Sequence, residues 1–498
     1  MTTVPESSGE FEPSSLDPQD WDEFRRHSHE LLDTCISRMA NARDYPWRPV
    51  DIEAAGTFRL DLNEPGIGHA KLASTLAESV LPYGTGNTHP RFFGWVHGTG
   101  LATGLLAEIV AATMNSNCGG RDHGATYIER EVIRWCAQVF DFPEDSSGLL
   151  VTGTSQATLI ALAVARHRAL GPRVRTEGLV NAPRLTAYAA EGAHSANSKA
   201  LELLGLGSTA LRAIPVCKKG GMDLARLVEA VQGDRAAGAQ PFCVIGTAGS
   251  VDRGEFDNLE DLADFCRREA LWFHVDGAFG AWARLADEPW RGLTRGMELA
   301  DSLAFDFHKW MYVQYDCGAV LIRDEAVHRA AFASRPSYLA GQGRGLGGGE
   351  PWYCDYGIDL SRGFRALKVW AAIRAHGRSA FGAAISRNCE LAEQMGQRTA
   401  SSDDLVLAAP VKLNVCCFSA APSGMDGPSS DALNTSIAQQ LQMDGDVVFS
   451  TVTVRGRTVI RAAITNHRTC SSDIRYAIDA VRRVRDQVLR DGRYKSFL

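Results

Sequence analysis

Short apolar runs alternate with amphipathic stretches through the middle of the chain, from about residue 86 to 335. Six runs have the length and hydrophobicity of buried strands: RLTAYAAEGAH, LRAIPVC, PFCVIGTAGSV, LWFHVDGA, DSLAFDF and GAVLIRD. Helix-like segments such as residues 258–269 separate several of them. Strands that alternate with helices in this way form mostly parallel sheets. The pattern therefore predicts an α/β domain over the middle of the chain.

The two ends of the chain have different patterns. Residues 21–85 carry helical periodicity broken by Pro46, Pro49 and the turn Asn63-Glu64-Pro65-Gly66, which predicts an N-terminal helical segment. Residues 1–20 are acidic and rich in Ser and Pro, and we expect a disordered tail there.

After residue 380 the order becomes helix, strand, helix, two strands and a final helix. The elements expected are 380–399, LNVCCFSAA, 431–443, DVVFSTVTV, TVIRAAITN and a helix from Ser471. Arg455-Gly456-Arg457 joins the last two strands as a hairpin. The boundaries predicted are thus 1–20, 21–85, a large domain over 86–379 and a small α+β domain over 380–498.

Composition narrows the kind of partner. The 498 residues carry a formal net charge of −7 and no basic run, which argues against binding nucleic acid or an anionic membrane. The most apolar long stretch, 99–114, contains Glu108 and is too short to cross a bilayer, so we expect a buried or interface helix. No secretory signal is recognisable in residues 1–20. A small-molecule substrate is the better expectation.

The twelve cysteines show no paired spacing. No C-x-x-C and no Cys/His pattern typical of a metal site occurs, so we predict no metal and reduced thiols in a cytoplasmic protein.

Two residues at strand ends carry the most distinctive chemistry. Asp276 ends the apolar run LWFHVD, and Lys309 follows the run DSLAFDF. A lysine amine forms a Schiff base with the aldehyde of pyridoxal phosphate (PLP), and a buried carboxylate keeps the pyridine nitrogen protonated, so that the ring accepts electrons. Strand ends of an open α/β sheet are where ligands bind. A surface lysine is the alternative for Lys309 alone, but its surroundings favour PLP.

Two further segments fit the same cofactor. GLLVTGTSQATLIALAVARHRAL predicts a strand, a turn and a helix, which places the amides and hydroxyls of Thr154 and Ser155 at a helix N-terminus that suits phosphate. His194 follows a strand and opens a helix, and a neutral imidazole can stack on a pyridine ring and transfer a proton. Alone, the first segment is equally explained by an ordinary helix N-cap, and His194 is better explained as a helix-capping or core histidine.

Together these segments resemble the group II PLP-dependent decarboxylases of fold type I, which include aromatic-amino-acid, glutamate and histidine decarboxylases. The similarity extends from about Pro82 to the C-terminus. It includes HPRFFGWVHG, PFCVIGTAGSVDRGEFDNL, DLSRGFRALKVW and RAAITNHRT. The resemblance implies PLP as cofactor and an α/β fold: a mostly parallel sheet of the seven-stranded type flanked by helices, an N-terminal helical layer and a small C-terminal domain.

The resemblance assigns roles to individual residues around the ring. Lys309 matches the Schiff-base lysine, and Asp276 matches the partner of the pyridine nitrogen. Ala278 packs beneath the ring in this comparison, His194 stacks over its other face, and Thr247 lies beside its polar edge.

Other matched positions lie near the phosphate or the lysine. They are Thr154, Ser155 and His308. Asp306 stands where several animal members have asparagine, and an anion would repel phosphate unless it is hydrogen-bonded elsewhere.

The reaction implied is decarboxylation of an L-amino acid to its amine. The substrate amine replaces Lys309 on the cofactor, CO2 leaves, and the carbanion is delocalised toward the nitrogen held by Asp276. Tyr338 lies where the family has a tyrosine on a mobile loop that protonates the α-carbon, and the Gly-rich stretch 341–349 supplies hinge freedom. A loop aromatic without a catalytic role is the alternative for Tyr338.

Three other functions remain open. Some relatives consume O2 after decarboxylation and release an aldehyde, and they tend to differ at the positions of Tyr338 or His194. This chain keeps both residues, which favours simple decarboxylation. Transamination or another PLP reaction is a second alternative. A non-catalytic PLP-fold binding protein is the third, and it gives no physical reason to keep Lys309, Asp276, His194 and Tyr338 together.

The sequence says less about the substrate and the assembly. Positions that match the aromatic-substrate pocket of relatives hold Asn87, Trp95, His97, Asn115 and Asn117, with Arg121 close by. Buried amides without partners are costly, so these residues favour a polar or extended amino acid. Arg121 suits either a distal carboxylate or an interface ion pair. The resemblance also implies a homodimer with the active site at the subunit interface.

Overall fold

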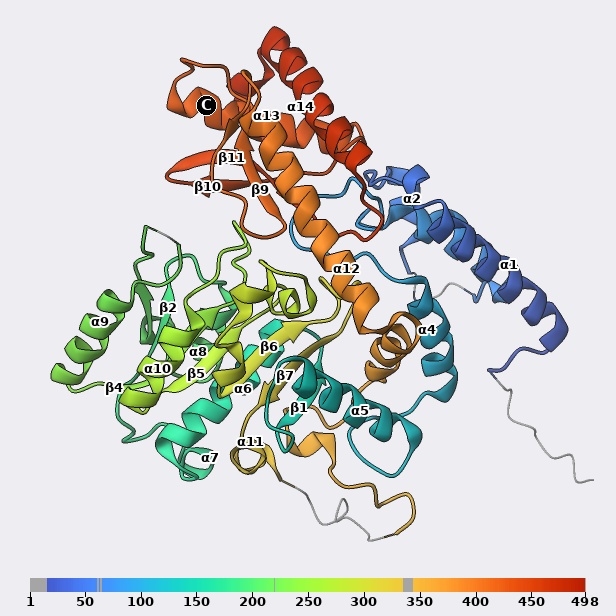
Figure 1. Ribbon diagram of the computed structural model, residues 1–498. Coiled ribbons are helices and arrows are strands. Elements are labelled where there is room, and N and C mark those ends of the chain that lie inside the picture. The colour runs from blue at the N-terminus through green and yellow to red at the C-terminus, as the bar shows by residue number, and fades with distance from the viewer. Residues whose placement is uncertain (1–15, 61, 63–64, 219, 335–343, 498) are drawn as a thin grey trace, which may run out of the picture. The chain divides into compact units, whose positions relative to one another are not determined.

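The computed structural model describes residues 16–60, 62, 65–218, 220–334 and 344–497, which divide into two units, 1–86 and 87–498 (Figure 1). The first unit is helical where it is described. Its helices are α1 (Trp21–Ala40), α2 (Ile52–Thr57) and α3 (Gly68–Thr75), and α3 is extended by a π-helical turn and a 3-10 turn. Asp20 begins α1, because its carboxylate accepts hydrogen bonds from the amides of Asp22 and Glu23. Of the expected N-terminal tail, residues 1–15 lie outside the described residues.

The second unit is built on a seven-stranded sheet in the order β1-β7-β6-β5-β4-β2-β3. The strands are β1 (Ser147–Val151), β2 (Leu185–Ala190), β3 (Leu211–Ile214), β4 (Gln240–Thr247), β5 (Trp272–Asp276), β6 (Ser302–Asp306) and β7 (Gly318–Ile322). Strand β7 runs antiparallel to both of its neighbours, and the other neighbouring pairs are parallel. The mostly parallel sheet predicted from the sequence is confirmed.

Helices flank this sheet, as the alternation of the sequence predicts. They are α4 (Ala102–Met114), α5 (Gly124–Val139), α6 (Thr154–Leu170), α7 (Val174–Glu177), α8 (Ala196–Leu203), α9 (Leu224–Ala236), α10 (Leu259–Glu269) and α11 (Glu325–Phe332). Helix α6 packs across strands β1, β4, β5, β6 and β7. The central strands are buried along their whole length, which explains why apolar residues predominate on both faces and do not alternate with polar ones.

The C-terminal residues form a second, four-stranded sheet in the order β10-β11-β9-β8. Its strands are β8 (Val406–Leu407), β9 (Val415–Ser419), β10 (Ser450–Val454) and β11 (Arg457–Ala463), covered by α13 (Gly427–Met443) and α14 (Ser471–Asp491). The predicted hairpin is present, with both Arg455 and Gly456 at positive φ, as a two-residue turn between antiparallel strands requires.

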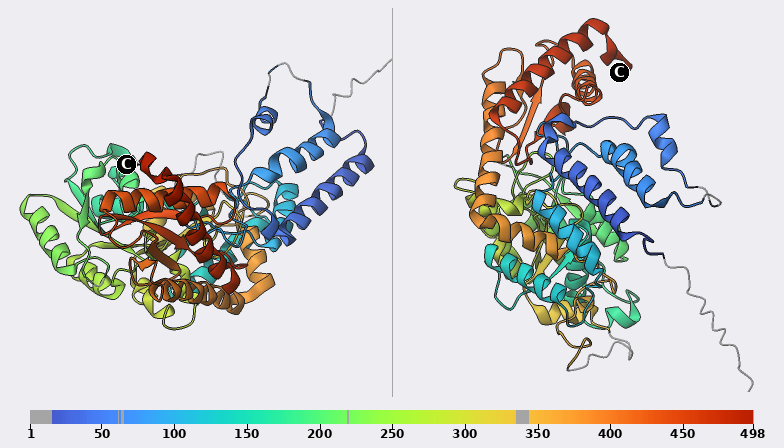
Figure 2. Two further views of the ribbon diagram at one scale, coloured as in Figure 1. Left: turned by 90° about the horizontal axis from the view of Figure 1, so that it is seen from above. Right: turned by 90° about the vertical axis from the view of Figure 1, so that its right-hand side faces the viewer.

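A long helix, α12 (Ala366–Ala400), connects the two sheets (Figures 1 and 2). Its first part packs on α4 and α5 and its second part on β8, β9 and α14. The sequence pattern predicted only the part from residue 380. The chain is already helical from Ala366, and Gly377 interrupts the helix with a φ of 72°.

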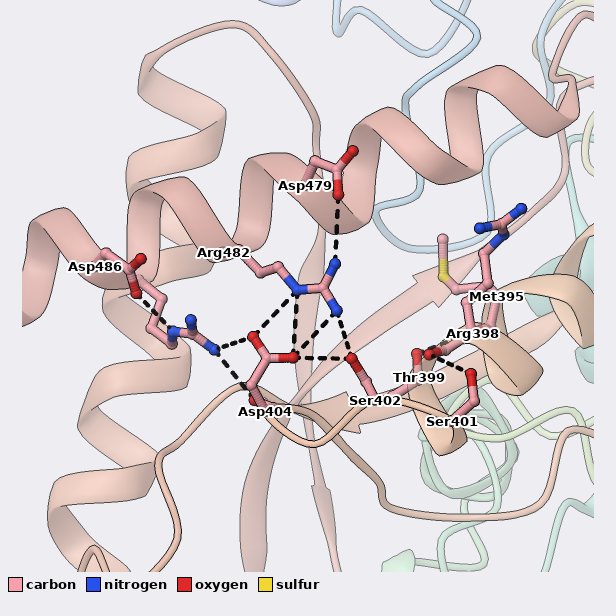
Figure 3. A network of polar contacts seen from close by, with 10 residues as sticks. Met395, Arg398, Thr399, Ser401, Ser402, Asp404, Asp479, Arg482 and Asp486 are labelled. Carbon is pink, nitrogen blue, oxygen red and sulfur yellow. Dashed lines mark hydrogen bonds and ion pairs between the residues drawn. The ribbon is translucent and has the colours of Figure 1, made fainter.

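An ion-pair network fixes the end of α12 to α14 (Figure 3). Asp404 contacts Arg482 at 3.1 Å and Arg485 at 2.8 Å, and Ser402 donates a hydrogen bond to Asp404. These two guanidinium groups hold the pKa of the Asp404 carboxyl well below its usual range. The network therefore orders the turn that leads into β8.

A buried ion pair connects helix α5, strand β1 and the segment before α12. Both Arg362 and Glu129 are almost fully buried, and Arg362 Nη2 lies 2.5 Å from Glu129 Oε1. Arg362 also donates to the carbonyls of Cys118 and Leu150, and Glu129 accepts a hydrogen bond from the amide of Leu150. All the charge in this pair is thus compensated by hydrogen bonds, which a buried ion pair requires.

None of the helices in the described parts of the chain is both long enough and apolar enough to cross a membrane.

Replacing Arg362 tests the importance of the buried pair. Arg362→Met leaves the Glu129 carboxylate buried without its cation, so we expect a loss of about 3–5 kcal/mol in the free energy of unfolding. The control is Arg173→Met, which removes an exposed ion pair to Glu177 and should leave the free energy of unfolding nearly unchanged. Denaturant unfolding measures both. Equal, small changes in the two variants would contradict the prediction.

Candidate active site

The carboxyl ends of the parallel strands gather the polar residues of the large sheet. Thr247, Asp276 and Asp306 are the last residues of β4, β5 and β6, and Thr247 pairs with Asp276 in the sheet register. Thr154 follows β1, and His194 follows β2. Because these strands are parallel, residues far apart in the sequence meet at one edge of the sheet.

A cavity of about 520 Å³ opens at this edge. It is lined by every cofactor-binding residue predicted from the sequence: Lys309, Asp276, Ala278, His194, Thr247, Thr154, Ser155 and His308. Asp306 lines it as well. The fold thus brings together in one cavity residues that are as far apart in the sequence as Thr154 and Lys309.

Lys309 and Asp306 form the central contact of the cavity. Lys309 Nζ lies 2.8 Å from Asp306 Oδ2, and Asp306 Oδ1 accepts a 2.7 Å hydrogen bond from the amide of Thr154. Asp306 is only 1% exposed, so its charge is compensated almost entirely by these groups. A Cβ atom on Gly318 would lie 2.5 Å from Asp306 Oδ1, so the close approach of β7 at this point requires glycine. Both carboxylate oxygens of Asp306 therefore have partners within the protein.

Asp276 lies on the neighbouring strand. Burial raises the pKa of Asp276, while the positive charge of Lys309 and a hydrogen bond from the amide of Ala278 act in the opposite direction. A carboxylate in this position gains from any cationic partner placed in the cavity. The protonated nitrogen of a pyridine ring is such a partner.

Two histidines in the cavity have one ring nitrogen occupied by the backbone. His194 Nδ1 accepts a hydrogen bond from the amide of Ala196 at 3.2 Å, and His308 Nδ1 accepts one from the amide of Cys317 at 2.9 Å. In the neutral rings the proton is therefore on Nε2. The His308 ring stacks on Tyr315 with centroids 4.4 Å apart, and burial lowers the pKa of His308, which keeps it neutral.

The start of helix α6 presents donors for an anion. The hydroxyl of Thr154 is buried and has no hydrogen-bond partner among the described residues. Ser155 is exposed and lines the cavity. A helix of this length also carries partial positive charge at its N-terminus. An orphaned buried hydroxyl at such a position suits a phosphate oxygen.

Asp257 is a functional candidate that the sequence reasoning missed. Its buried carboxylate accepts hydrogen bonds from the amides of Thr247 at 2.7 Å and Met222 at 2.6 Å, and so fixes Thr247 at the cavity edge. Burial raises its pKa, and the two amides oppose that effect. The segment GEFDNL contains Asp257, but no spacing in it indicates a carboxylate that bonds two distant amides.

One end of the cavity is aromatic. The ring of His97 stacks on Trp95 and Phe92, and it meets Tyr315 edge to face. Burial and the charge of Lys309 lower the pKa of His97, which favours the neutral imidazole. Both Trp95 and His97 line the cavity, as expected for substrate-pocket residues.

The other four pocket positions expected from the sequence do not line this cavity. Asn87 donates to the carbonyl of Gly98, and Asn117 accepts from the amides of Gly119 and Arg362. Asn115 ends α4 in a left-handed conformation. The guanidinium of Arg121 lies over the ring of Trp352. Within the chain, Asn87, Asn115 and Asn117 have local backbone roles and Arg121 packs on an aromatic ring, and their part in substrate binding stays a prediction.

Tyr338, the predicted proton donor, lies outside the described residues.

The donor set fits PLP. A lysine, a buried carboxylate at the end of β5, a hydroxyl at a helix N-terminus and a flat histidine supply the contacts that an aldehyde, a pyridine nitrogen, a phosphate and a ring face need. The cavity is also large enough for a small ring compound with an attached amino acid.

Comparisons with known proteins agree with this chemistry. The pyridoxal-dependent decarboxylase conserved domain matches residues 66–421. Aromatic-L-amino-acid decarboxylase of Bacillus atrophaeus is 29% identical over 94% of this chain and 96% of its own length. The crystal structure of Oryza sativa TDC with PLP and tryptamine covers 95% of this chain and 100% of that chain, with a TM-score of 0.86 and 25% identity.

A third similarity concerns the fold alone. Rhodiola rosea 4-hydroxyphenylacetaldehyde synthase has a TM-score of 0.83 at 23% identity and covers 95% of this chain and 100% of that chain. The family and the fold expected from the sequence are confirmed. The chain belongs to the pyridoxal-dependent decarboxylase family, and pyridoxal phosphate is its cofactor.

Proposed function

We propose that the protein decarboxylates an aromatic L-amino acid to the corresponding amine. The observation that carries this proposal is the single cavity in which Lys309, Asp276 and the N-terminus of α6 meet. The family match supports the reaction class. The printed activity of the Bacillus atrophaeus relative and the aromatic wall formed by Trp95 and His97 support the substrate class.

PLP, when bound, supplies an electron sink that makes loss of CO2 from an amino-acid α-carbon feasible. Lys309 Nζ would hold the aldehyde of PLP and would be displaced from it by the substrate amine. For that exchange Nζ must give up a proton, and Asp306 Oδ2 at 2.8 Å is the nearest acceptor in the described site. Asp306 also orients the lysine, because its second oxygen is fixed by the amide of Thr154.

Asp276 has the complementary task at the other end of the ring. Its buried carboxylate would keep a proton on the pyridine nitrogen, because an unpaired anion in this environment is unfavourable and a cation beside it is stabilised. Thr154 and Ser155 would hold the phosphate, and Ala278 and His194 would contact the ring. The His194 proton on Nε2 is available to the substrate carboxylate.

We assign protonation of the α-carbon to Tyr338. Its place in the sequence after Lys309 and the retention of His194 support a decarboxylase over an enzyme that releases an aldehyde.

We also propose a homodimer with the active site at the subunit interface. Helix α4 supports this assembly, because its large apolar side chains Leu106, Ile109, Val110 and Met114 are exposed in the single chain. Light scattering of the purified protein should give a mass near twice 54.0 kDa. A mass near 54.0 kDa at micromolar concentration would refute the dimer.

A cytoplasmic location completes the proposal. All twelve cysteines lie in described residues, and none of them forms a disulfide, which is typical of a reducing compartment.

Replacing Lys309 tests whether the protein is an enzyme at all. Wild-type protein incubated with PLP and dialysed should keep a visible absorbance band, whereas Lys309→Ala should lose the band and release CO2 at least about 10³-fold more slowly. Lys199→Ala, on the exposed surface of α8, is the matched control and should behave as wild type. A wild-type protein that retains no PLP would support a non-catalytic binding protein.

Replacing Tyr338 tests the reaction outcome. CO2, amine, aldehyde and H2O2 are measured together under air with a panel of amino acids. Wild type should form amine and CO2 in equal amounts without peroxide. Tyr338→Phe should raise the ratio of aldehyde to amine at least about tenfold and should form peroxide, because the carbanion lacks its proton donor.

The control for this variant is Tyr127→Phe, an exposed tyrosine that donates to Asp122 and does not line the cavity. Aldehyde and peroxide from the wild type would identify an oxidative aldehyde synthase, and unchanged products in Tyr338→Phe would remove the role assigned to this tyrosine.

A further inference from the structure

Arg461 is a buried arginine of the small sheet that bonds to the wall of the active-site cavity. It lies in β11 and is 3% exposed. Its guanidinium donates to the carbonyl of Trp95 at 3.3 Å, to the carbonyl of Asp252 at 3.2 Å, to the carbonyl of Val251, and to Ser450 Oγ at 3.1 Å. Three of these four acceptors are backbone oxygens of loops in the large domain.

The bonding of Arg461 differs from that of the other buried arginine described above. Arg362 has the carboxylate of Glu129 as its counter-ion, whereas no carboxylate among the described residues forms an ion pair with Arg461. Burial lowers the pKa of Arg461 accordingly. A buried cation without a counter-ion is costly, so only its full set of hydrogen bonds stabilises it. The loop carbonyls and the guanidinium therefore hold each other in place.

A neighbour of Arg461 in the small sheet bonds to the same loop, the one that contains Val251 and Asp252. Ser450, Arg461 and Cys417 lie opposite one another on β10, β11 and β9. The Cys417 thiol donates to the carbonyl of Asp252 at 3.5 Å, which is the same oxygen that Arg461 Nε contacts. These three neighbouring residues on β10, β11 and β9 thus form the surface of the small sheet that contacts the loop after β4.

The loop atoms bonded to these residues belong to residues of the cavity wall. Trp95, Val251 and Asp252 all line the cavity. Trp95 has a φ of 53°, a left-handed conformation that a bulky residue adopts only when its surroundings hold it there. The bond from Arg461 to the Trp95 carbonyl supplies such a restraint.

We propose that Arg461 is a positioning residue for substrate binding: by joining the Trp95 and Val251–Asp252 loops, it sets the shape of the cavity wall that receives the substrate side chain. This proposal rests on the proposed decarboxylase function for its kinetic part. Arg461 does not line the cavity, and Lys309, Asp276 and Thr154 do not bond to it. Its loss should consequently weaken substrate binding more than the chemical step.

The variants are Arg461→Met, which keeps the size of the side chain but removes every donor, and Arg461→Lys, which keeps the charge but has one point-like donor group. Arg457→Met is the matched control. It lies on the same strand and bonds to Asp431 and the carbonyl of Gly427, away from the cavity.

The first readout is amide hydrogen exchange of the PLP-loaded full-length protein, which does not depend on turnover. Arg461→Met should exchange at least about tenfold faster in the peptides that cover 93–98 and 249–254, with the rest of the chain unchanged. Arg461→Lys should fall between Arg461→Met and wild type, and Arg457→Met should match wild type in both segments.

The second readout is steady-state kinetics with the best amino acid. Arg461→Met should retain the PLP absorbance band and raise KM about tenfold, with kcat within about threefold of wild type. Unchanged exchange in the two segments, or faster exchange throughout the chain with loss of PLP, would overturn the proposal. If wild type decarboxylates no amino acid, the proposed function fails, and hydrogen exchange alone decides the role of Arg461.

Discussion

The site depends on the contacts that the buried carboxylate of Asp306 makes with two other parts of the large sheet's edge. This carboxylate is buried at the end of β6, and it holds two parts of the active site at once: the amine of Lys309 at 2.8 Å and the first amide of helix α6 at 2.7 Å. A buried anion requires such partners, and a lysine close to a strand end requires an anion. The amine of Lys309 and the N-terminus of α6 are therefore fixed relative to each other.

The mostly parallel sheet makes this arrangement possible. Lys309, Asp276 and Thr154 come from three separate crossover units, and they meet because the carboxyl ends of β1, β5 and β6 share one edge. Asp257 adds a further constraint by bonding the amides of Thr247 and Met222. Each polar group at this edge thus either faces the cavity or fixes a group that does.

The two buried arginines, Arg362 and Arg461, differ in the groups that compensate their charge. Arg362 has a carboxylate counter-ion and ties secondary structure elements together, which makes it a determinant of stability. Arg461 has only carbonyl and hydroxyl oxygens, and those oxygens belong to loops that line the cavity. The small C-terminal sheet is connected in this way to the wall of the cavity at the edge of the large sheet.

The sequence by itself determined the chemistry and the order of the elements. Apolar runs identified the central strands, and the polar residues at their ends identified Lys309, Asp276 and Thr154, because burial leaves few other reasons for such residues at strand ends. Tertiary structure decided what periodicity cannot encode. It paired Asp306 with Lys309 and Thr154, it used Asn115 and Asn117 in local backbone contacts outside the cavity, and it brought Arg461 to Trp95 across 366 residues. Such contacts depend on which chain segments become neighbours in space, and no local pattern of residue types carries that information.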